Sequence, residues 1–489
     1  MIRCGESMTK MRRIGHGLIV LAALAATGCG GNSDAAGQAG VSPEGGAVID
    51  DHFSVSTALS SVIPTVATVT WSIEGVTSLD EAHIDFGKSS GTYGMTAPAQ
   101  VDGAGPWQTI LIGMKPSTEY HFRITARSGA QSYVSASRTV TTGNVEPKLP
   151  TASVTMNDAS KHAQGFMLTT MLAVPPAAVI LDSDGDYVWW YLPPTPDRDL
   201  ELSRARMTAD HQWVYMWSVN LLSTGDNPGG PGTVGSLNQR IIKVRIDGSD
   251  EQEVSIPNGH HDFTILPDGT IGYIEYDVRT VDSRTVAGDR LMERKPDGST
   301  TEIYSVWNDF QYDGQPIPEG AGWCHANFLE YHEDENVYYM GSKTFGSILK
   351  IDRATGKLLH AFGGTHSDFT VSTGGTTPYE DQHGFQVQGN DLLVFDNGPQ
   401  QRMSSRSVEY TFDESSKLMT LVWSYTPSPT LFNFSMGNAL HLPNGNRLVS
   451  FAISGQVDEV DSSSNLVWRL NLGLGGALGY VTWKESLYE

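Results

Sequence analysis

Cysteine is scarce in this sequence. Only three cysteines, Cys4, Cys29 and Cys324, occur among 489 residues. We expect a cleaved leader over residues 1–28 and a lipid on Cys29, which would leave Cys324 as the one free thiol of the mature chain. An intramolecular disulfide is then excluded, even in a compartment that permits disulfides.

Basic residues are also few. Lysine and arginine number 32 against 55 aspartates and glutamates, so the formal net charge is −23, and no run of basic residues forms a stripe. Nucleic acid and anionic membrane surfaces both bind through clustered positive charge. We therefore expect neither as a partner, and the excess of acid indicates a solvated surface.

Apolar runs long enough to cross a bilayer are missing as well. The stretch GLIVLAALAATG at residues 17–28 is too short for that and follows the basic residues Lys10, Arg12 and Arg13. It leads into AATGCGG, which is similar to the lipobox of bacterial lipoproteins with Cys29 at the acylated position. The pattern predicts an exported protein that is lipid-anchored to the cell envelope, in the periplasm or at the outer membrane. A plain secretory peptide cleaved nearby is the alternative.

Two kinds of segment follow the leader. Residues 29–55 are rich in Gly, Ala, Ser and acid without an apolar period, which is typical of a flexible tether. Residues 56–145 alternate apolar and polar residues in short runs, with Trp71 in mid-strand and Pro116 before Tyr120. This pattern resembles a small fibronectin type III β-sandwich with its tyrosine corner, and predicts core packing for Trp71 and Tyr120.

The remaining residues, 146–489, repeat a unit of four short strands. Each unit pairs an apolar hairpin around a turn such as LPDG with a second hairpin around an acidic turn, and the second hairpins number six. Six such units predict a six-bladed β-propeller, so the whole chain is expected to be all-β. The first unit lacks an inner strand, and YVTWKESLYE at residues 480–489 is expected to supply it. Four tryptophans near the outer strands are interpreted as packing between blades: Trp189, Trp307, Trp423 and Trp468.

Histidines recur in three consecutive units. His261, His325 and His383 each open the first strand of a unit, and the first strand of a blade lines the central channel. We therefore expect the three imidazoles to converge at the mouth of the channel. Because neighbours on a strand point to opposite faces, the same reasoning excludes His260 from the site and places Cys324 between blades.

Three kinds of function suit three converging histidines. They could hold zinc or copper as a metalloenzyme does, although only Asp262 and Asp381 are near in sequence to brace them. A neutral imidazole could instead act as a nucleophile, with the others as acid, base or anion donors. A propeller that only binds a ligand, or serves as a scaffold, is the non-catalytic alternative.

Several motifs resemble the bacterial arylsulfate sulfotransferase family. They occur in the expected order over about residues 150–475 and include NGHHDFTILPDG, GWCHANFLEY, DQHGFQV, LLVFDNG and NALHLPNGNRLVSF. The resemblance implies a six-bladed propeller that transfers a sulfuryl group from an aryl sulfate to a phenol through a sulfohistidine, with no cofactor and no nucleotide donor. It implies that His383 is the nucleophile, that His261 and His325 are catalytic, and that Asn327 binds substrate.

The sequence departs from the family pattern at two points. Lys343 stands where the family carries an arginine, so the substrate-binding cation keeps its charge but loses the bidentate fork that suits a sulfate group. The family's disulfide-clamped loop near the nucleophile also cannot form here. Both departures leave weaker binding, a different donor or a non-catalytic propeller open.

Overall fold

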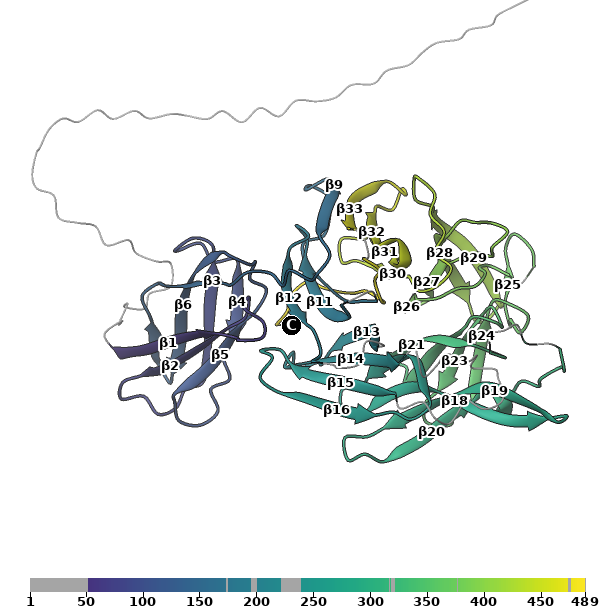
Figure 1. Ribbon diagram of the computed structural model, residues 1–489, viewed down its shortest axis with the longest axis horizontal. Coiled ribbons are helices and arrows are strands. Elements are labelled where there is room, and N and C mark those ends of the chain that lie inside the picture. Colours follow the sequence, from purple (N-terminus) through teal and green to yellow (C-terminus); the bar gives the residue numbers. More distant parts are fainter. Residues whose placement is uncertain are drawn as a thin grey trace, which may run out of the picture. The chain divides into compact units, whose positions relative to one another are not determined.

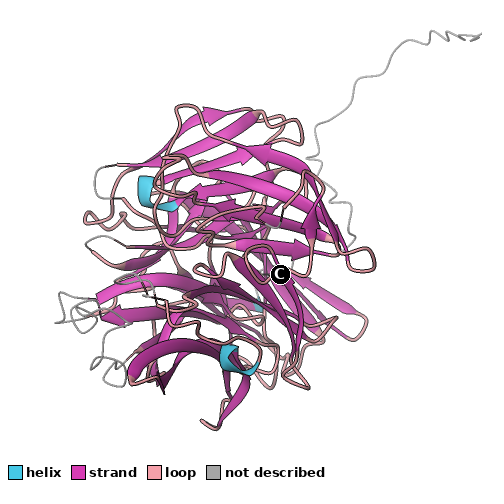
Figure 2. Ribbon diagram, turned by 90° about the vertical axis from the view of Figure 1, so that its right-hand side faces the viewer, coloured by secondary structure: helices cyan, strands magenta, loops and turns pink. Residues whose placement is uncertain are grey.

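The computed structural model describes residues 52–172, 175–194, 200–220, 239–315, 317, 322–375, 377–473 and 476–488. The expected leader, Cys29 and nearly all of the expected tether therefore lie outside the described residues. Almost every regular element is a strand, and the described residues also contain two short 3-10 helices, η2 (Val306–Asn308) and η3 (Ala452–Ser454) (Figure 2). No helix among the described residues is long and apolar enough to cross a membrane.

The N-terminal strands form two antiparallel sheets around one apolar core. The sheet orders are β1-β2-β5 and β4-β3-β6-β7, with β8 paired to β6. Trp71 and Tyr120 are buried in this core, as predicted, and the Tyr120 hydroxyl accepts a hydrogen bond from the Lys115 backbone N–H at 2.9 Å. The first strand begins at Phe53, earlier than the expected boundary at residue 56, because the Phe53 side chain belongs to the core. The strands are β1 (Phe53–Leu59), β2 (Ala67–Ile73), β3 (Glu81–Gly87), β4 (Met95–Pro98), β5 (Trp107–Leu111), β6 (Glu119–Ser128), β7 (Gln131–Val134) and β8 (Arg138–Thr141).

The rest of the described chain builds six sheets, four of four strands and two of five, and each contains the four antiparallel strands of one propeller blade. Strands such as β12, YVWWY, are buried on both faces because each blade packs between two others. The first three blades consist of β10 (Phe166–Met171), β11 (Ala177–Asp182), β12 (Tyr187–Tyr191) and β34 (Thr482–Lys484); β13 (Leu200–Met207), β14 (Trp213–Asn220), β15 (Arg240–Arg245) and β16 (Glu251–Ser255); and β17 (Gly259–Ile265), β18 (Ile271–Val281), β19 (Arg284–Arg294) and β20 (Thr300–Ser305).

The last three blades carry two additional strands. The parallel strand β25 (Thr370–Val371) adds to the outer edge of the fifth blade, and β9 (Ala152–Asn157) adds to the sixth. These blades consist of β21 (Ala326–His332), β22 (Val337–Ser342), β23 (Ser347–Asp352) and β24 (Leu358–Phe362); β26 (Phe385–Gln388), β27 (Asp391–Asp396), β28 (Arg406–Asp413) and β29 (Leu418–Tyr425); and β30 (Asn438–His441), β31 (Arg447–Phe451), β32 (Gln456–Val460) and β33 (Leu466–Leu472).

The ring closes at two places. The C-terminal strand β34 pairs with β10 and takes the inner position of the first blade, which confirms the prediction that residues 480–489 complete it. The early strand β9 pairs with β33, so blue and yellow strands lie side by side in Figure 1. Both ends of the propeller segment are therefore held by ladders of backbone hydrogen bonds.

The four tryptophans near the outer strands pack between neighbouring blades, as predicted, and three of their indoles also donate a hydrogen bond to the next blade. Trp189 donates to the Ile246 carbonyl of the second blade at 2.8 Å, and Trp468 donates to the Ser183 carbonyl of the first at 2.9 Å. Trp423 reaches the sixth blade in the same way. Trp307, in η2 after the last strand of the third blade, donates to a carbonyl of its own blade, but its ring packs 4.2 Å from that of Trp323, which leads into the fourth blade.

Candidate active site

The His383 imidazole lies at the inner end of the fifth blade, two residues before β26 begins, and is only 3% exposed. Its Nδ1 is 2.8 Å from Asn397 Oδ1 and 3.2 Å from the Asp381 carbonyl oxygen. Both partners are acceptors, so Nδ1 carries the proton. The lone pair of the neutral ring is therefore on Nε2, where it is free to act as a nucleophile.

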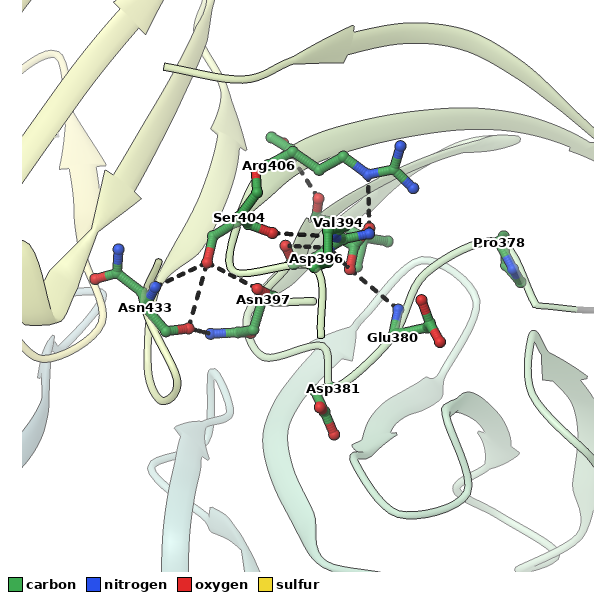
Figure 3. A network of polar contacts seen from close by, with 12 residues as sticks. Pro378, Glu380, Asp381, Val394, Asp396, Asn397, Ser404, Arg406 and Asn433 are labelled. Atoms are coloured by element: carbon green, nitrogen blue, oxygen red, sulfur yellow. Dashed lines mark hydrogen bonds and ion pairs between the residues drawn. The ribbon is translucent and has the colours of Figure 1, made fainter. Parts of the chain in front are cut away.

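The orientation of the Asn397 amide fixes this tautomer. Asn397 Nδ2 donates to the backbone carbonyls of Asn433 at 2.7 Å and Met436 at 2.9 Å, which leaves only Oδ1 to face His383. Figure 3 shows Asn397 joined to Asn433, while the Asp381 carboxylate points away from this network. Thus the backbone of Asp381, rather than its carboxylate, assists in holding the ring.

The environment keeps His383 neutral. Burial first, and then the positive charge of Lys343, lower the pKa of His383 from 6.5 to about 3, although the hydrogen bond to Asn397 opposes the shift. The ring is therefore unprotonated at neutral pH. A neutral, oriented imidazole with one free nitrogen is what nucleophilic catalysis requires.

His261 and His325 meet beside His383. Their ring centroids are 4.8 Å apart, and both residues are half-buried. Burial first, and then positive charge on His325, His260, His383 and Lys343, hold the pKa of His261 well below 6.5. The structure thus brings together the three histidines that the sequence predicted to converge.

The predicted alignment of the three histidines is wrong for His383. His261 and His325 share a left-handed backbone, with φ of 62° and 50°, but the residue in that conformation in the fifth blade is Asp381 at 53°. His383 therefore corresponds to Asn327, two residues after the left-handed position of the fourth blade. Counting back from the turn of the first hairpin of each blade misplaces His383, because these hairpins differ in length between blades.

Asn327 is a clamp between blades. It is fully buried, and its Nδ2 donates to the carbonyl of Gln382, the residue before His383, at 2.8 Å. Asn438 holds the equivalent place in the sixth blade, where its Nδ2 donates to the Val481 carbonyl and its Oδ1 accepts from the Val481 N–H. The geometry therefore indicates that Asn327 positions the backbone next to His383, while its buried Oδ1 has no hydrogen-bond partner among the described residues. Binding of substrate by Asn327 stays a prediction.

The exclusion of His260 from the site is wrong. Its Nδ1 lies 2.8 Å from His261 Nδ1, and its ring stacks on Tyr276 with centroids 3.9 Å apart. Alternation fails here because the left-handed backbone at His261 and a register shift between Gly259 and Phe263 interrupt the strand. In the sequence, the adjacency of His260 and His261 is the one feature that indicates a contact between their rings.

Lys343 is the cation of the site. It is half-buried, its backbone N–H donates to the His325 carbonyl, and its charge lowers the pKa of both His261 and His383. No carboxylate of the described residues pairs with it. An unneutralised ammonium next to a neutral nucleophile suits an anionic group that is attacked there.

A metal centre gains no support from the geometry of the histidines. In the described part of the chain, one group of three potential ligands has all donor atoms within 4.8 Å of one another, and it comprises Asp182, Asp184 and Asp186. Lys115 Nζ lies 3.0, 2.7 and 2.5 Å from these carboxylates and balances their charge. The histidines of the site do not form such a group.

Comparison with known proteins adds one family and several folds. A family model described as Arylsulfotransferase (ASST) matches residues 151–472. No curated protein sequence matches the chain.

Among solved structures, the Nidogen/Laminin complex gives a TM-score of 0.40 at 9% identity over 65% of this chain and 98% of that one. A streptogramin B lyase gives 0.38 at 12% identity over 68% and 98%, and an auxiliary nutrient binding protein from Bacteroides ovatus gives 0.38 at 10% identity over 86% and 90%. At such scores nothing about the site follows from these structures.

Proposed function

Because the chain belongs to the arylsulfotransferase family over residues 151–472, we propose that it transfers a sulfuryl group from an aryl sulfate to a phenol in two steps, through a sulfohistidine at His383 and without a nucleotide donor. The observation that carries the proposal is the His383–Asn397 hydrogen bond of 2.8 Å. It places the proton on Nδ1 and leaves Nε2 as the only nucleophilic atom of the ring.

In the first step His383 Nε2 attacks the sulfur of the donor. An N–S bond forms, the S–O bond to the aryl group breaks, and the electron pair leaves on the phenolate oxygen. Phenolate is a good leaving group because the pKa of its conjugate acid is about 10. In the second step the acceptor phenol gives its proton to a neighbouring base and its oxygen attacks the same sulfur. The N–S bond breaks, and its electron pair returns to Nε2 of the regenerated imidazole.

Catalysis of such a transfer depends on positioning and on fixed charge. The sulfuryl oxygens gain little charge in a loose transition state, so a preorganised cation and hydrogen-bond donors supply most of the stabilisation. Lys343 is the cation that this chain offers, and His261 and His325 are the neighbouring donors. A single ammonium provides one point of charge where a guanidinium would provide a fork.

The test is a single-turnover experiment with a chromogenic aryl sulfate and no acceptor. We expect about one equivalent of phenol per protein to appear in a burst, together with an adduct of one sulfuryl mass on the peptide that contains DQHGFQV. His383→Ala should abolish both signals, whereas His261→Ala or His325→Ala should slow the burst by about 10²-fold or more.

The matched control is His441→Ala, which removes a histidine of the sixth blade whose Nε2 contacts Glu409 instead of the site. This variant should keep the burst. An adduct on a residue other than His383 would disprove the nucleophile. No burst and no adduct with a series of aryl sulfates would favour the ligand-binding propeller.

We further propose that the protein is exported and held to the cell envelope by lipid on Cys29. The support is the sequence of residues 1–31 alone, with its basic start, short apolar stretch and AATGCGG. In membrane fractionation, Cys29→Ala should move the protein from the membrane to the soluble fraction. A wild-type protein that is already soluble and starts beyond Cys29 would contradict the anchor.

A further inference from the structure

A carboxylate that the proposed reaction does not use, Asp289 on β19, lies behind the histidine cluster. It is 1% exposed, and its Oδ1 is 3.1 Å from His260 Nε2. His260 is itself 6% exposed, and its other nitrogen lies 2.8 Å from His261 Nδ1. Asp289, His260 and His261 therefore form a continuous line from the interior of the third blade to the active site.

The second oxygen of Asp289 supports the neighbouring blade. Oδ2 accepts hydrogen bonds from Cys324 Sγ at 2.7 Å and from the Ala326 N–H at 2.5 Å, the two residues that flank His325. Burial first, and then the Asp289 charge, raise the pKa of Cys324 well above its usual range, so the thiol remains a donor. One buried carboxylate thus fixes the backbone of His325 and faces the ring that contacts His261.

The carboxylate remains charged in this position. Burial by itself would raise its pKa, but the contact with His260 and the hydrogen bonds from Cys324 and Ala326 hold the pKa of Asp289 below its usual value. A buried carboxylate against an imidazole compensates the imidazolium form of that ring. The pair can therefore carry a proton without leaving an isolated buried charge.

We propose that His260 and Asp289 form a proton relay behind His261, which protonates the departing phenolate in the first half-reaction and accepts a proton from the acceptor phenol in the second. The inference rests on the proposed sulfuryl transfer. In this scheme His261 touches the reacting oxygen, whereas His260 and Asp289 act through it as positioning residues.

The protons balance without any other reactant. Before transfer, His260 is an imidazolium facing Asp289, its Nδ1–H donates to His261 Nδ1, and His261 Nε2 carries a proton. That Nε2 proton moves to the phenolate oxygen while the Nδ1 proton of His260 moves to His261 Nδ1, so His260 becomes neutral and retains Nε2–H towards Asp289. The second half-reaction reverses both moves, and His261 never carries a net charge, in keeping with its buried position beside Lys343.

The experiment measures the burst rate of adduct formation for aryl sulfates whose leaving phenols differ in acidity, with wild type, His260→Gln and Asp289→Asn. A phenol of low acidity needs a proton as it departs, whereas a highly acidic phenol does not. We expect both variants to slow the least acidic leaving groups by about 10²-fold or more and to change the most acidic ones less than threefold. The dependence of rate on leaving-group acidity therefore becomes steeper.

A control variant, His441→Gln, removes an imidazole–carboxylate contact of the same length, 3.1 Å to Glu409, in the sixth blade. It should leave the whole series unchanged. If His260 and Asp289 had a purely structural role, their variants would lower the burst rate by one common factor for every donor. That result would overturn the relay.

A second measurement needs no variant. For the least acidic leaving group, the wild-type burst should be slower in D₂O than in H₂O, and for the most acidic one the two rates should match. Equal rates for every donor would overturn the relay even if both variants failed to fold. A wild-type protein that forms no adduct would instead show that sulfuryl transfer itself is wrong.

Discussion

Replacing Asn397 by alanine tests whether the tautomer of His383 is built into the fold. The substitution removes three buried hydrogen bonds, to His383 Nδ1 at 2.8 Å and to the Asn433 and Met436 carbonyls at 2.7 and 2.9 Å. At about 1 kcal/mol net for each, the free energy of unfolding should fall by about 3 kcal/mol. Loss of the one bond to His383 Nδ1, at about 1 kcal/mol, shifts the ratio of the two ring tautomers about fivefold towards the form with the proton on Nε2.

The assay is the burst of phenol release, measured together with the position of the sulfuryl group on the modified peptide by nuclear magnetic resonance. In wild type the group should be on Nε2 of His383 alone. In Asn397→Ala the burst should slow by up to about fivefold, because only the Asp381 carbonyl, at 3.2 Å, remains to hold the Nδ1 proton.

Asn446→Ala is the matched control. It also removes a buried amide that donates to a backbone carbonyl, that of Lys161, but does so in the sixth blade away from His383. It should lose stability without losing burst rate. A folded Asn397→Ala variant with the wild-type burst rate, or a wild-type adduct on Nδ1, would refute the assignment of the tautomer.

Three further predictions follow from the site. With a highly acidic leaving group the burst rate should be constant from pH 8 to pH 5, because the pKa of His383 is lowered to about 3, and a rate that drops with an ordinary histidine pKa near 6.5 would contradict this. The buried rings of His383 and His261 stay neutral in the folded protein at pH values where the same rings bind a proton in the unfolded chain. The free energy of unfolding should therefore fall as the pH drops below 6.5, by up to about 1.4 kcal/mol per pH unit for each ring. Lys343→Arg should raise turnover or donor affinity several-fold in steady-state kinetics if one ammonium is a weak sulfate clamp, whereas a loss would show that the site is adapted to lysine. Gly384→Ala should lower the melting temperature, measured by circular dichroism, because its Cβ would lie 2.2 Å from Asn438 Cβ, and a stable, fully active variant would show that the two blades separate easily.

Local patterns were enough to predict the architecture. Five of the six blades take their four main strands from one contiguous stretch of alternating residues and turns, so the repeat predicts six blades. The missing inner strand of the first blade points to the C-terminal residues that supply it as β34. The same locality placed His261, His325 and His383 near the channel.

The details of the site depend on contacts that no local pattern encodes. Strict alternation of side chains along a strand excludes His260 from the site, but the left-handed backbone at His261 interrupts that alternation. Asn397 stood within the LLVFDNG motif without a role, because its partners Asn433 and Met436 are far along the chain. The Asp289 carboxylate meets Cys324 from another blade, and neither residue type in its own segment signals that pairing.

The closing segment of the propeller also has a consequence for the order of events during biosynthesis. The Tyr480 hydroxyl donates to the Asn327 carbonyl at 2.8 Å, and the Asn327 side chain in turn holds the backbone directly before His383. A ribosome makes residue 480 almost a hundred residues after the nucleophile, so a nascent chain that already contains every catalytic group still lacks this support. The surroundings of His383 are thus incomplete in a nascent chain until the segment that contains Tyr480 has been translated and has docked.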